Sequence, residues 1–141
     1  MSKGDTFEND ILKLIFNATA IADLAENDTS SPATTLTVAL HTADPGEAGT
    51  QLTSETAYTG YARVTVARTA GGWTVTGSSV SPVANIDFGE CTASPGGNIT
   101  HASIGTGVGN KLLWSGVLSA AIVMGVGVIP RIKSTSTIVE D

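Results

Sequence analysis

The stretch RVTVARTAGGWTVT, residues 63–76, decides the fold class of this chain. Val64 and Val66 alternate with polar or small residues, and residues 73–76 follow the same alternation. A period of two residues is that of a β-strand with one buried face. Gly71 and Gly72 separate the two segments, and such a pair suits the tight turn of a hairpin. The stretch predicts an antiparallel β-hairpin in a chain that folds mainly as sheet.

The same signal recurs on both sides of this stretch. Turn sequences at residues 44–46 (Asp-Pro-Gly) and 95–97 (Pro-Gly-Gly) separate the segments. We expect about eight short strands, at residues 36–40, 64–67, 73–76, 83–88, 99–106, 111–118, 126–133 and 135–140. Regularly spaced short strands are typical of an antiparallel β-sandwich, here a jelly roll. With 41% hydrophobic and 14% charged residues, the composition is that of a folded domain.

An N-terminal α-helix is expected over residues 5–26. Asp5 can cap it, and Glu8 three residues later completes a capping box. One face carries apolar residues at spacings of three and four: Phe7, Ile11, Leu14, Ala18, Ile21 and Ala25. Leu12 and Phe16 fall on the opposite side. Either the helix contacts two neighbours, or these two side chains are exposed or covered by a loop.

The expected domain organisation is one structural unit with an N-terminal extension. Residues 1–31 form the helix and a polar linker that ends before Pro32, and residues 32–141 form the β-sandwich. A long loop, residues 42–59, interrupts the strands.

Residues 112–129 carry no charged residue, which leaves two interpretations open. Eighteen uncharged residues reach the lower limit for a membrane-spanning helix. The other interpretation is two buried strands with a turn near residues 119–121. Interrupting glycines and serines and many β-branched residues favour the strands.

Charge and cysteine content restrict the partners and the compartment. A net charge of −6 argues against a nucleic-acid partner, which requires a basic surface. Cys91 is the single cysteine, so an internal disulfide is impossible. The first residues lack a basic segment followed by an apolar one, and we expect no signal peptide.

The sequence contains no constellation typical of catalysis or of a metal site. His41, His101, Cys91 and Asp87 lack zinc-ligand spacing. Asp44 and Glu47 are a weak pair for a cation, and the glycines of residues 105–109 lack the spacing of a phosphate loop. We therefore expect no catalytic residue, no metal, no cofactor and no enzymatic activity.

Two groups of apolar side chains are candidate contacts to a partner. Tyr58 and Tyr61 flank Thr59-Gly60 at the end of the long loop, where they can anchor a partner or cover the end of the sandwich. The helix supplies the second group, which is Phe7, Ile11, Leu12 and Phe16.

Several motifs in order resemble a family of small virion proteins of tailed phages. They are LTVALHTADPGEAG (36–49), GYARV (60–64), NIDF (85–88), HASIG (101–105) and LWSGVL (113–118). The similarity extends over about residues 5–133 and includes the jelly-roll cement proteins of short-tailed phages. The resemblance implies a structural role without catalysis, and synthesis in the cytoplasm of a bacterial host.

The leading hypothesis is a capsid cement, or decoration, protein on the outer surface of the virion. It would bind the major capsid protein, stabilise the head against packaged DNA and self-associate, with a dimer favoured. It would contact neither nucleic acid nor membrane. The alternatives are a minor tail or tail-fibre-base protein, and a membrane-active protein that uses residues 112–129.

Overall fold

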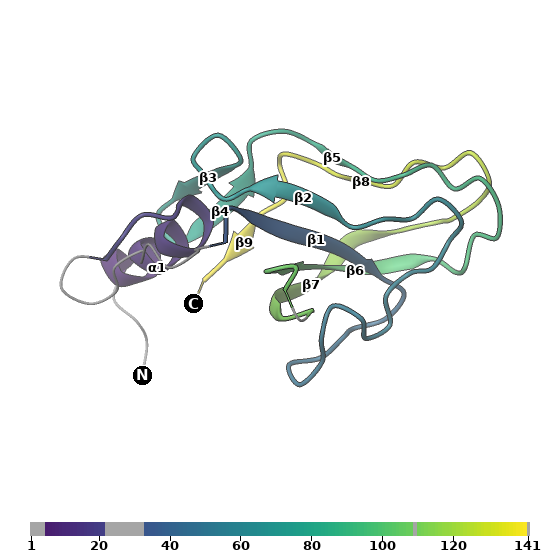
Figure 1. Cartoon of the computed structure of the whole chain (residues 1–141), viewed down its shortest axis with the longest axis horizontal. Helices are drawn as coiled ribbons and strands as arrows, with labels where there is room; N and C mark the ends of the chain where they lie inside the picture. Colours follow the sequence, from purple (N-terminus) through teal and green to yellow (C-terminus); the bar gives the residue numbers. More distant parts are fainter. Residues whose placement is uncertain (1–4, 22–32, 109, 141) are drawn as a thin grey trace. The chain divides into compact units, whose positions relative to one another are not determined.

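The chain is mainly antiparallel β-sheet with one N-terminal helix, as the sequence predicts. The computed structural model describes residues 5–21, 33–108 and 110–140. Its elements are shown in Figure 1 and are α1 (Asp5–Asn17), β1 (Thr35–His41), β2 (Val64–Ala67), β3 (Trp73–Thr76), β4 (Ser79–Pro82), β5 (Ile86–Asp87), β6 (Ile99–Gly105), β7 (Leu112–Ile122), β8 (Arg131–Ile132) and β9 (Ile138–Val139). The antiparallel sheets are consistent with a β-sandwich.

The strands form three sheets, and the chain divides into two compact units. The sheet orders are β2-β1-β6-β7, β3-β4-β9 and β5-β8. The helix unit contains the described residues up to Thr35, Ala67–Ile86 and those from Ile132 onward, and the sheet unit contains Leu36–Val66 and Asp87–Arg131. The predicted division after residue 31 stays a prediction, because it lies outside the described residues.

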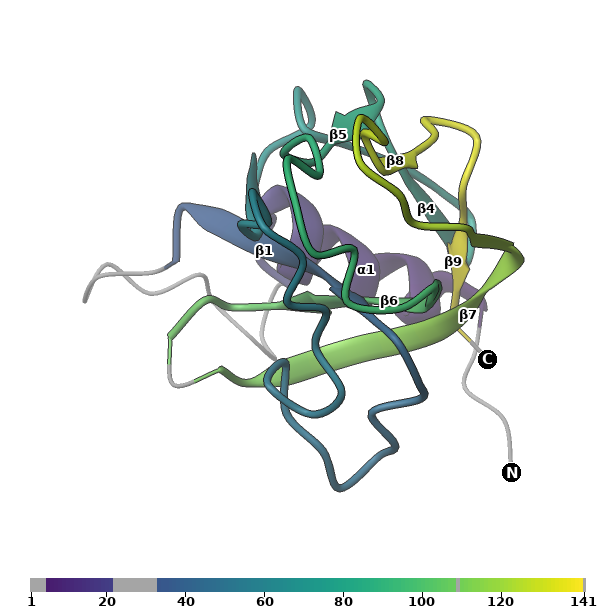
Figure 2. The same cartoon turned by 90° about the vertical axis from the view of Figure 1, so that its right-hand side faces the viewer.

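The sheet unit is built around β1 and β6. Six of the seven β1 residues are buried, and β1 pairs antiparallel with β6 from Thr37↔Gly105 to His41↔His101. β6 pairs antiparallel with β7 on its other side, and Figure 2 shows β7 beside β6 at the margin of this sheet. Residues on both faces of β1 are buried, and the long loop after β1 returns to the sheet, where Thr56 N–H donates to Leu40 O at 2.9 Å.

The hairpin predicted at residues 63–76 is wrong in its pairing. β2 lies beside β1, whereas β3 pairs antiparallel with β4 in the register Trp73↔Pro82 to Thr76↔Ser79. Gly77, at a positive φ of 59°, and Ser78 form the two-residue turn of the β3–β4 hairpin. The segment around Gly71 and Gly72 is instead a turn in which Gly72 N–H donates to Thr69 O at 2.9 Å. The period of two located both strands, but it could not choose their partners.

The helix is shorter than predicted and ends at Asn17. Ala18 has a positive φ of 55°, and Thr19 N–H donates to Lys13 O at 3.1 Å, which is a C-terminal capping geometry. The Arg68 guanidinium donates to the carbonyl oxygens of Ile15, at 2.5 Å, and of Leu14. These groups satisfy the last helical carbonyls, so the helix stops here although the apolar pattern continues. The predicted residues 22–26 lie outside the described residues.

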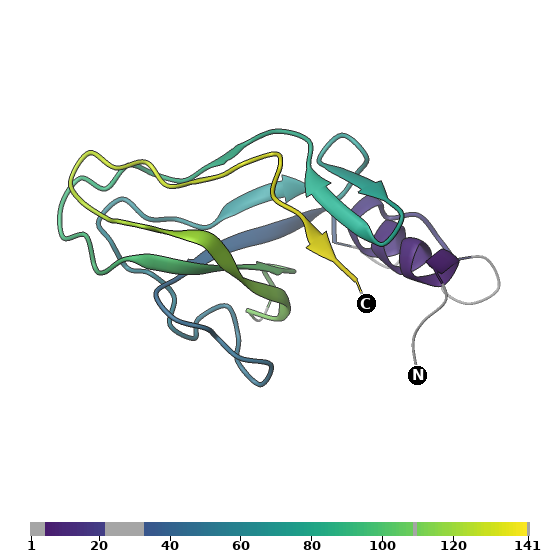
Figure 3. The same cartoon turned by 180° about the vertical axis from the view of Figure 1, so that it is seen from behind.

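The helix also buries a different face from the one expected. Its buried side chains are Glu8, Leu12 and Phe16, at spacings of four. The Phe16 ring packs edge-on against Trp73 of β3, with ring centroids 4.9 Å apart. Figure 3 shows α1 beside the β3–β4 hairpin, where Asn9 Nδ2 donates to Gly77 O at 2.7 Å. Leu12 and Phe16 are therefore not exposed, and the alternative in which a neighbouring element covers this side of the helix holds: Trp73 of β3 packs against Phe16.

The uncharged run starts with one long strand, and not with two buried strands joined by a turn. Residues 119–121 lie within β7, which is eleven residues long and mostly exposed. The register jumps from His101↔Val117 to Ile99↔Ile122, so an insertion in β7 bends the strand where the turn was expected. Among the described residues, no helix is long and apolar enough to cross a membrane.

Candidate interaction surface

The long loop after β1 is fixed to the sheet by a buried polar network. His41 is fully buried, with Nδ1 2.9 Å from Thr53 O and Nε2 2.7 Å from Ser103 Oγ. Because a carbonyl oxygen only accepts, Nδ1 carries a proton and donates it to Thr53 O. The two contacts of the ring hold the loop against β6.

Gln51 fixes the same loop at a second point. Its side chain is fully buried, and Nε2 donates to Thr37 O at 2.9 Å and to Ser103 Oγ at 3.4 Å. Its backbone N–H donates to Asn110 O at 3.0 Å. The loop therefore contacts β1, β6 and the β6–β7 connection, and it is a built part of the sheet unit.

The buried His41 predicts a loss of stability in mild acid. Burial is the largest influence on the pKa of His41 and lowers it below 6.5, and the charges of Arg63 and His101 also lower it. The hydrogen bond to Thr53 O and the charge of Glu55 raise the pKa, but they do not offset the effect of burial. The unfolded chain then binds a proton near pH 6.5 that the folded chain excludes. The contribution of His41 to the free energy of unfolding is therefore fully present above about pH 6.5. At lower pH this contribution decreases, by up to about 1.4 kcal/mol per pH unit.

Urea titrations between pH 7.5 and 5 measure this slope. A His41→Gln variant is expected to be less stable than the wild type at pH 7. Its free energy of unfolding should no longer decrease as the pH is lowered from 6.5 to 5. The matched His101→Gln variant is expected to keep this decrease. An equal slope in the wild type and in His41→Gln contradicts the assignment.

A partly buried ion pair fixes the end of the loop. Glu55 accepts from Arg63 Nε at 2.6 Å, from Arg63 Nη2 at 2.7 Å and from the Tyr61 hydroxyl at 2.8 Å. Burial alone would raise the pKa of Glu55, but these hydrogen bonds and the Arg63 charge outweigh it and lower the pKa. Arg63 also donates to Asn110 Oδ1 at 2.8 Å, which links the loop to the β6–β7 connection.

Replacing Arg63 by methionine is expected to destabilise the chain by about 2 kcal/mol at pH 7, because it leaves a partly buried carboxylate without its cation. The lowered pKa of Glu55 means that its ion pair stabilises the fold above about pH 4.5. The decrease in the free energy of unfolding caused by Arg63→Met should therefore be smaller once Glu55 is protonated. Urea unfolding of the variant and the wild type at pH 7 and at pH 4 measures this difference. The matched Arg131→Met variant breaks an exposed pair with Asp87 and should have little effect at either pH. Equal losses for the two variants would refute the role of burial.

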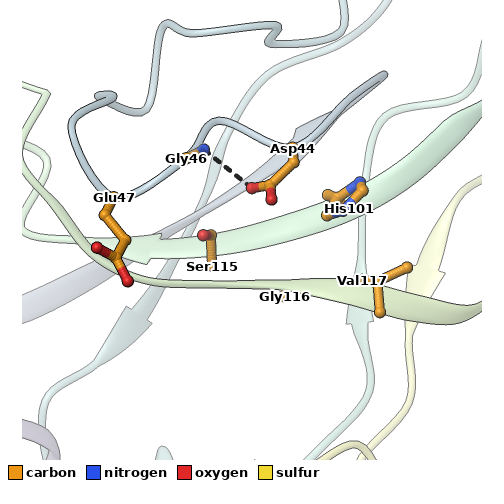
Figure 4. A pocket seen from close by; sticks show the side chains of 7 residues that line it. All are labelled: Asp44, Gly46, Glu47, His101, Ser115, Gly116 and Val117. Carbon is orange, nitrogen blue, oxygen red and sulfur yellow. Dashed lines mark hydrogen bonds between the residues drawn. The ribbon is translucent and has the colours of Figure 1, made fainter.

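The loop and the sheet together enclose an open hollow, shown in Figure 4. Its volume is about 370 Å³, and it is lined by Asp44, Gly46, Glu47, His101, Ser115, Gly116 and Val117. Gly46 N–H donates to Asp44 Oδ1 at 2.9 Å, which orients the carboxylate beside the sheet. Within the part of the chain that the structure describes, neither Asp44 nor Glu47 forms a salt bridge. The hollow is acidic, and β7 forms one wall of it.

Four large apolar side chains of β7 and the segment after it are exposed. The exposed fractions are 74% for Val117, 72% for Val123, 70% for Val126 and 54% for Ile129. All four lie in the uncharged run of residues 112–129. Where such side chains form a contiguous patch, the patch is a candidate surface for binding another protein.

The candidate contact residues predicted from the sequence lie mostly in the interior. Leu12 and Phe16 are fully buried, Tyr58 is 2% exposed and Ile11 is half-buried. The side chain of Phe7 lies outside the described residues. A role of these residues in partner binding stays a prediction, but their burial leaves little surface for a partner in this conformation.

The two tyrosines contact the chain itself. The Tyr58 hydroxyl donates to Gly89 O at 2.7 Å. Tyr61 stacks on Phe88 with centroids 6.2 Å apart, and its hydroxyl accepts from Leu40 N–H at 3.1 Å. Of the two roles considered for the tyrosines, these contacts favour the one in which Tyr58 and Tyr61 cover the end of the sandwich. The exposed Val117 of β7 and the exposed Val123 and Val126 after it were missed, because the preferred interpretation of the uncharged run was two buried strands.

The residues considered for a zinc site do not gather. No group of three or more His, Cys, Asp or Glu side chains in the described ranges is arranged to hold a metal ion. His41 and His101 face each other across the β1–β6 pair, and Cys91 is buried elsewhere with its thiol 3.4 Å from Ala93 O.

The chain is a virion structural protein of short-tailed bacteriophages, as the comparison of its sequence with protein families shows. Residues 2–140 match the family described as "Podophage GP4 fiber I protein gp80", and the chain belongs to this family. No curated protein matches the chain. The family confirms the resemblance to phage virion proteins and indicates a location in the virion.

Proposed function

We propose that this chain is a non-enzymatic structural subunit of a fibre on the virion of a short-tailed phage. The single observation that carries the proposal is the family match, which extends over residues 2–140 and therefore over nearly the whole chain. The family description names a fibre protein, and the proposal transfers that role to this chain.

The geometry of the sheet unit supports a role in assembly over one in catalysis. Ser103 and His41, which are hydrogen-bonded to each other, are 2% and 0% exposed, so a substrate could not reach this serine hydroxyl. The network instead fixes the loop that walls the acidic hollow. The unit also exposes an uncharged strand, β7, and such a strand suits contacts between protein subunits.

A cement protein on the outside of the capsid is the second candidate function. It is favoured by the mainly β fold and by the exposed apolar side chains of residues 117–129, which a junction between major capsid protein subunits could bury. Many weak contacts of this kind add up when they repeat over a shell.

Copy number in purified virions separates the two candidates. Quantitative mass spectrometry, with the major capsid protein as internal standard, is expected to find a few to a few tens of copies, and gold-labelled antibodies against this chain should mark the tail. Hundreds of copies and label over the head would replace the fibre with the cement function. Absence from washed particles would contradict both.

A further inference from the structure

We propose that residues 42–54 form a flap, held against the sheet by His41, that opens as a unit in mild acid while the sheet stays folded. The proposal goes beyond the role in a fibre or a capsid, because it assigns a conformational change and its trigger. It does not depend on either function: a chain found in virions whose flap stays closed in acid would overturn only this inference.

The first argument is that the flap contributes little to the apolar core. Within residues 42–54 only Pro45 and Gln51 are buried, and Leu52, the largest apolar residue of the flap, is 61% exposed. The core of the sheet unit comes instead from the strands, and its buried aliphatic side chains include Leu36, Val38 and Leu40 in β1 and Ile99 and Ile104 in β6. A segment with few buried apolar contacts opens at a lower free energy than the whole fold. The flap can therefore open while this core stays in place.

The second argument is that polar contacts, which meet at Ser103, hold the flap closed. His41 Nδ1 donates to Thr53 O at 2.9 Å, and His41 Nε2 lies 2.7 Å from Ser103 Oγ. Gln51 Nε2 lies 3.4 Å from the same hydroxyl oxygen. Gln51 Oε1 is buried and, in the described part of the chain, has no hydrogen-bond partner. A buried oxygen without a partner costs free energy, and water would satisfy it in the open flap.

The third argument is the burial of His41, the group among these anchors that titrates in mild acid. His41 is 0% exposed, so a second proton on its ring would place a charge away from water. Lifting the flap removes Thr53 O from the ring and lets water reach it. The open flap therefore binds this proton more readily than the closed flap, and acid favours opening.

The charged and titratable groups around His41 do not cancel this effect. They are Glu55, Arg63, Tyr61, which bonds Glu55, and His101, which pairs with His41 across β1 and β6. Burial is the largest influence and lowers the pKa of His41, and the charges of Arg63 and His101 act in the same direction. The Glu55 charge opposes them, but this carboxylate already accepts hydrogen bonds from Arg63 and Tyr61.

The end of the flap stays fixed in the same pH range. Burial alone would raise the pKa of Glu55, but the hydrogen bonds from Arg63 and Tyr61 outweigh it, and the pKa lies below 4.5. Glu55 therefore remains ionised and paired with Arg63 between pH 6.5 and 5. The change in this range is confined to the segment between His41 and Glu55.

Opening of the flap would change the acidic hollow. Asp44, Gly46 and Glu47 of the flap line one side of it, and residues of β6 and β7 line the other, as Figure 4 shows. An open flap would remove the wall that carries both carboxylates. The pH of the medium would thus control which groups this face of the sheet unit presents.

Native-state hydrogen exchange of the full chain, followed residue by residue by NMR at pH 7.5, 6.5 and 5.5, tests the flap. Protection factors correct for the exchange rate of an unfolded peptide at each pH. The Gln51 amide donates to Asn110 O at 3.0 Å, outside the flap. It should be at least about tenfold less protected than the amides that join β1 to β6, and low urea should not change its exchange. Its protection should fall by up to about tenfold per pH unit below 6.5.

Three variants separate the trigger from the flap. In His41→Gln the protection of the Gln51 amide should no longer fall between pH 6.5 and 5.5. His101→Gln, at the histidine paired with His41, is the matched control and should keep the pH dependence. Ser103→Ala removes the shared hydroxyl and should lower the protection of the Gln51 amide already at pH 7.5. If His41→Gln does not fold, the ring protons of His41 in the wild type report the trigger, because their titration should accompany the loss of protection.

Two results would overturn the proposal. The first is a Gln51 amide with the same protection and the same urea dependence as the β1–β6 amides, because the flap would then open only when the sheet unfolds. The second is a protection that does not change with pH, or that falls as much in His41→Gln as in the wild type.

Discussion

Replacing Trp73 by alanine is expected to lower the free energy of unfolding of the helix unit by about 3–5 kcal/mol. Trp73 is 1% exposed, and its ring fills the space between β3 and the helix, where it meets Phe16 edge-on. Alanine would remove the whole aromatic ring and leave a cavity that a two-strand hairpin and one helix cannot collapse around. The helix should then lose its aromatic contact with β3 and keep only its other contacts, such as the hydrogen bond from Asn9 to Gly77 O.

Urea unfolding followed by far-ultraviolet circular dichroism measures this loss. Trp73→Phe should cost much less, because it keeps an aromatic ring against Phe16, and the indole Nε1 has no hydrogen-bond partner in the described structure. Val139→Ala, at an exposed position of the same unit, controls for the loss of apolar atoms in general. A loss below about 1 kcal/mol for Trp73→Ala would mean that the helix does not depend on this contact.

The second large effect is expected at Gly60. This residue has a φ of 103°, and a Cβ there would lie 2.1 Å from Glu90 O, a backbone atom that cannot move aside. Gly89 approaches the same place from the other side, because its own Cβ would lie 2.0 Å from Gly60 O. The two segments touch backbone to backbone, and the Tyr58 hydroxyl closes the contact through Gly89 O.

Gly60→Ala should destabilise the sheet unit by about 2–5 kcal/mol, because a strained φ and a backbone clash add together. Gly77→Ala separates the two causes. Gly77 also has a positive φ, of 59°, but no heavy atom lies within 4 Å of an added Cβ. Gly77→Ala should therefore lower the free energy of unfolding by only about 1 kcal/mol. Urea midpoints of the two variants give the comparison, and equal losses would show that the close approach of residues 60 and 89 is unimportant.

The local patterns of the sequence located most strands, but not their partners. The alternation of residues 64–67 and 73–76 was sufficient to predict β2 and β3, because a half-buried strand has a period of two whatever it pairs with. Their pairing was predicted wrongly, because Gly71-Gly72 is a stronger local turn signal than Gly77-Ser78. Whether a turn closes a hairpin depends on which strands are free to pair.

The candidate surface could be predicted only in part. The absence of charge in residues 112–129 is visible in the sequence. The exposure of β7 is not visible, since a buried strand and an exposed edge strand can share the same apolar composition. Tyr58 and Phe16 illustrate the converse, because large apolar residues were expected to meet a partner and instead fill the interior.

The sequence by itself determined the mainly β class, the position of the N-terminal helix and the membership of a phage virion family. These properties follow from short-range periodicity and from residue types, which act over a few neighbours along the chain. The tertiary structure alone decided where the helix ends, which of its faces is buried and that β7 is an edge. Those outcomes depend on Arg68, Trp73 and the order of strands, which are brought together from distant parts of the chain by packing.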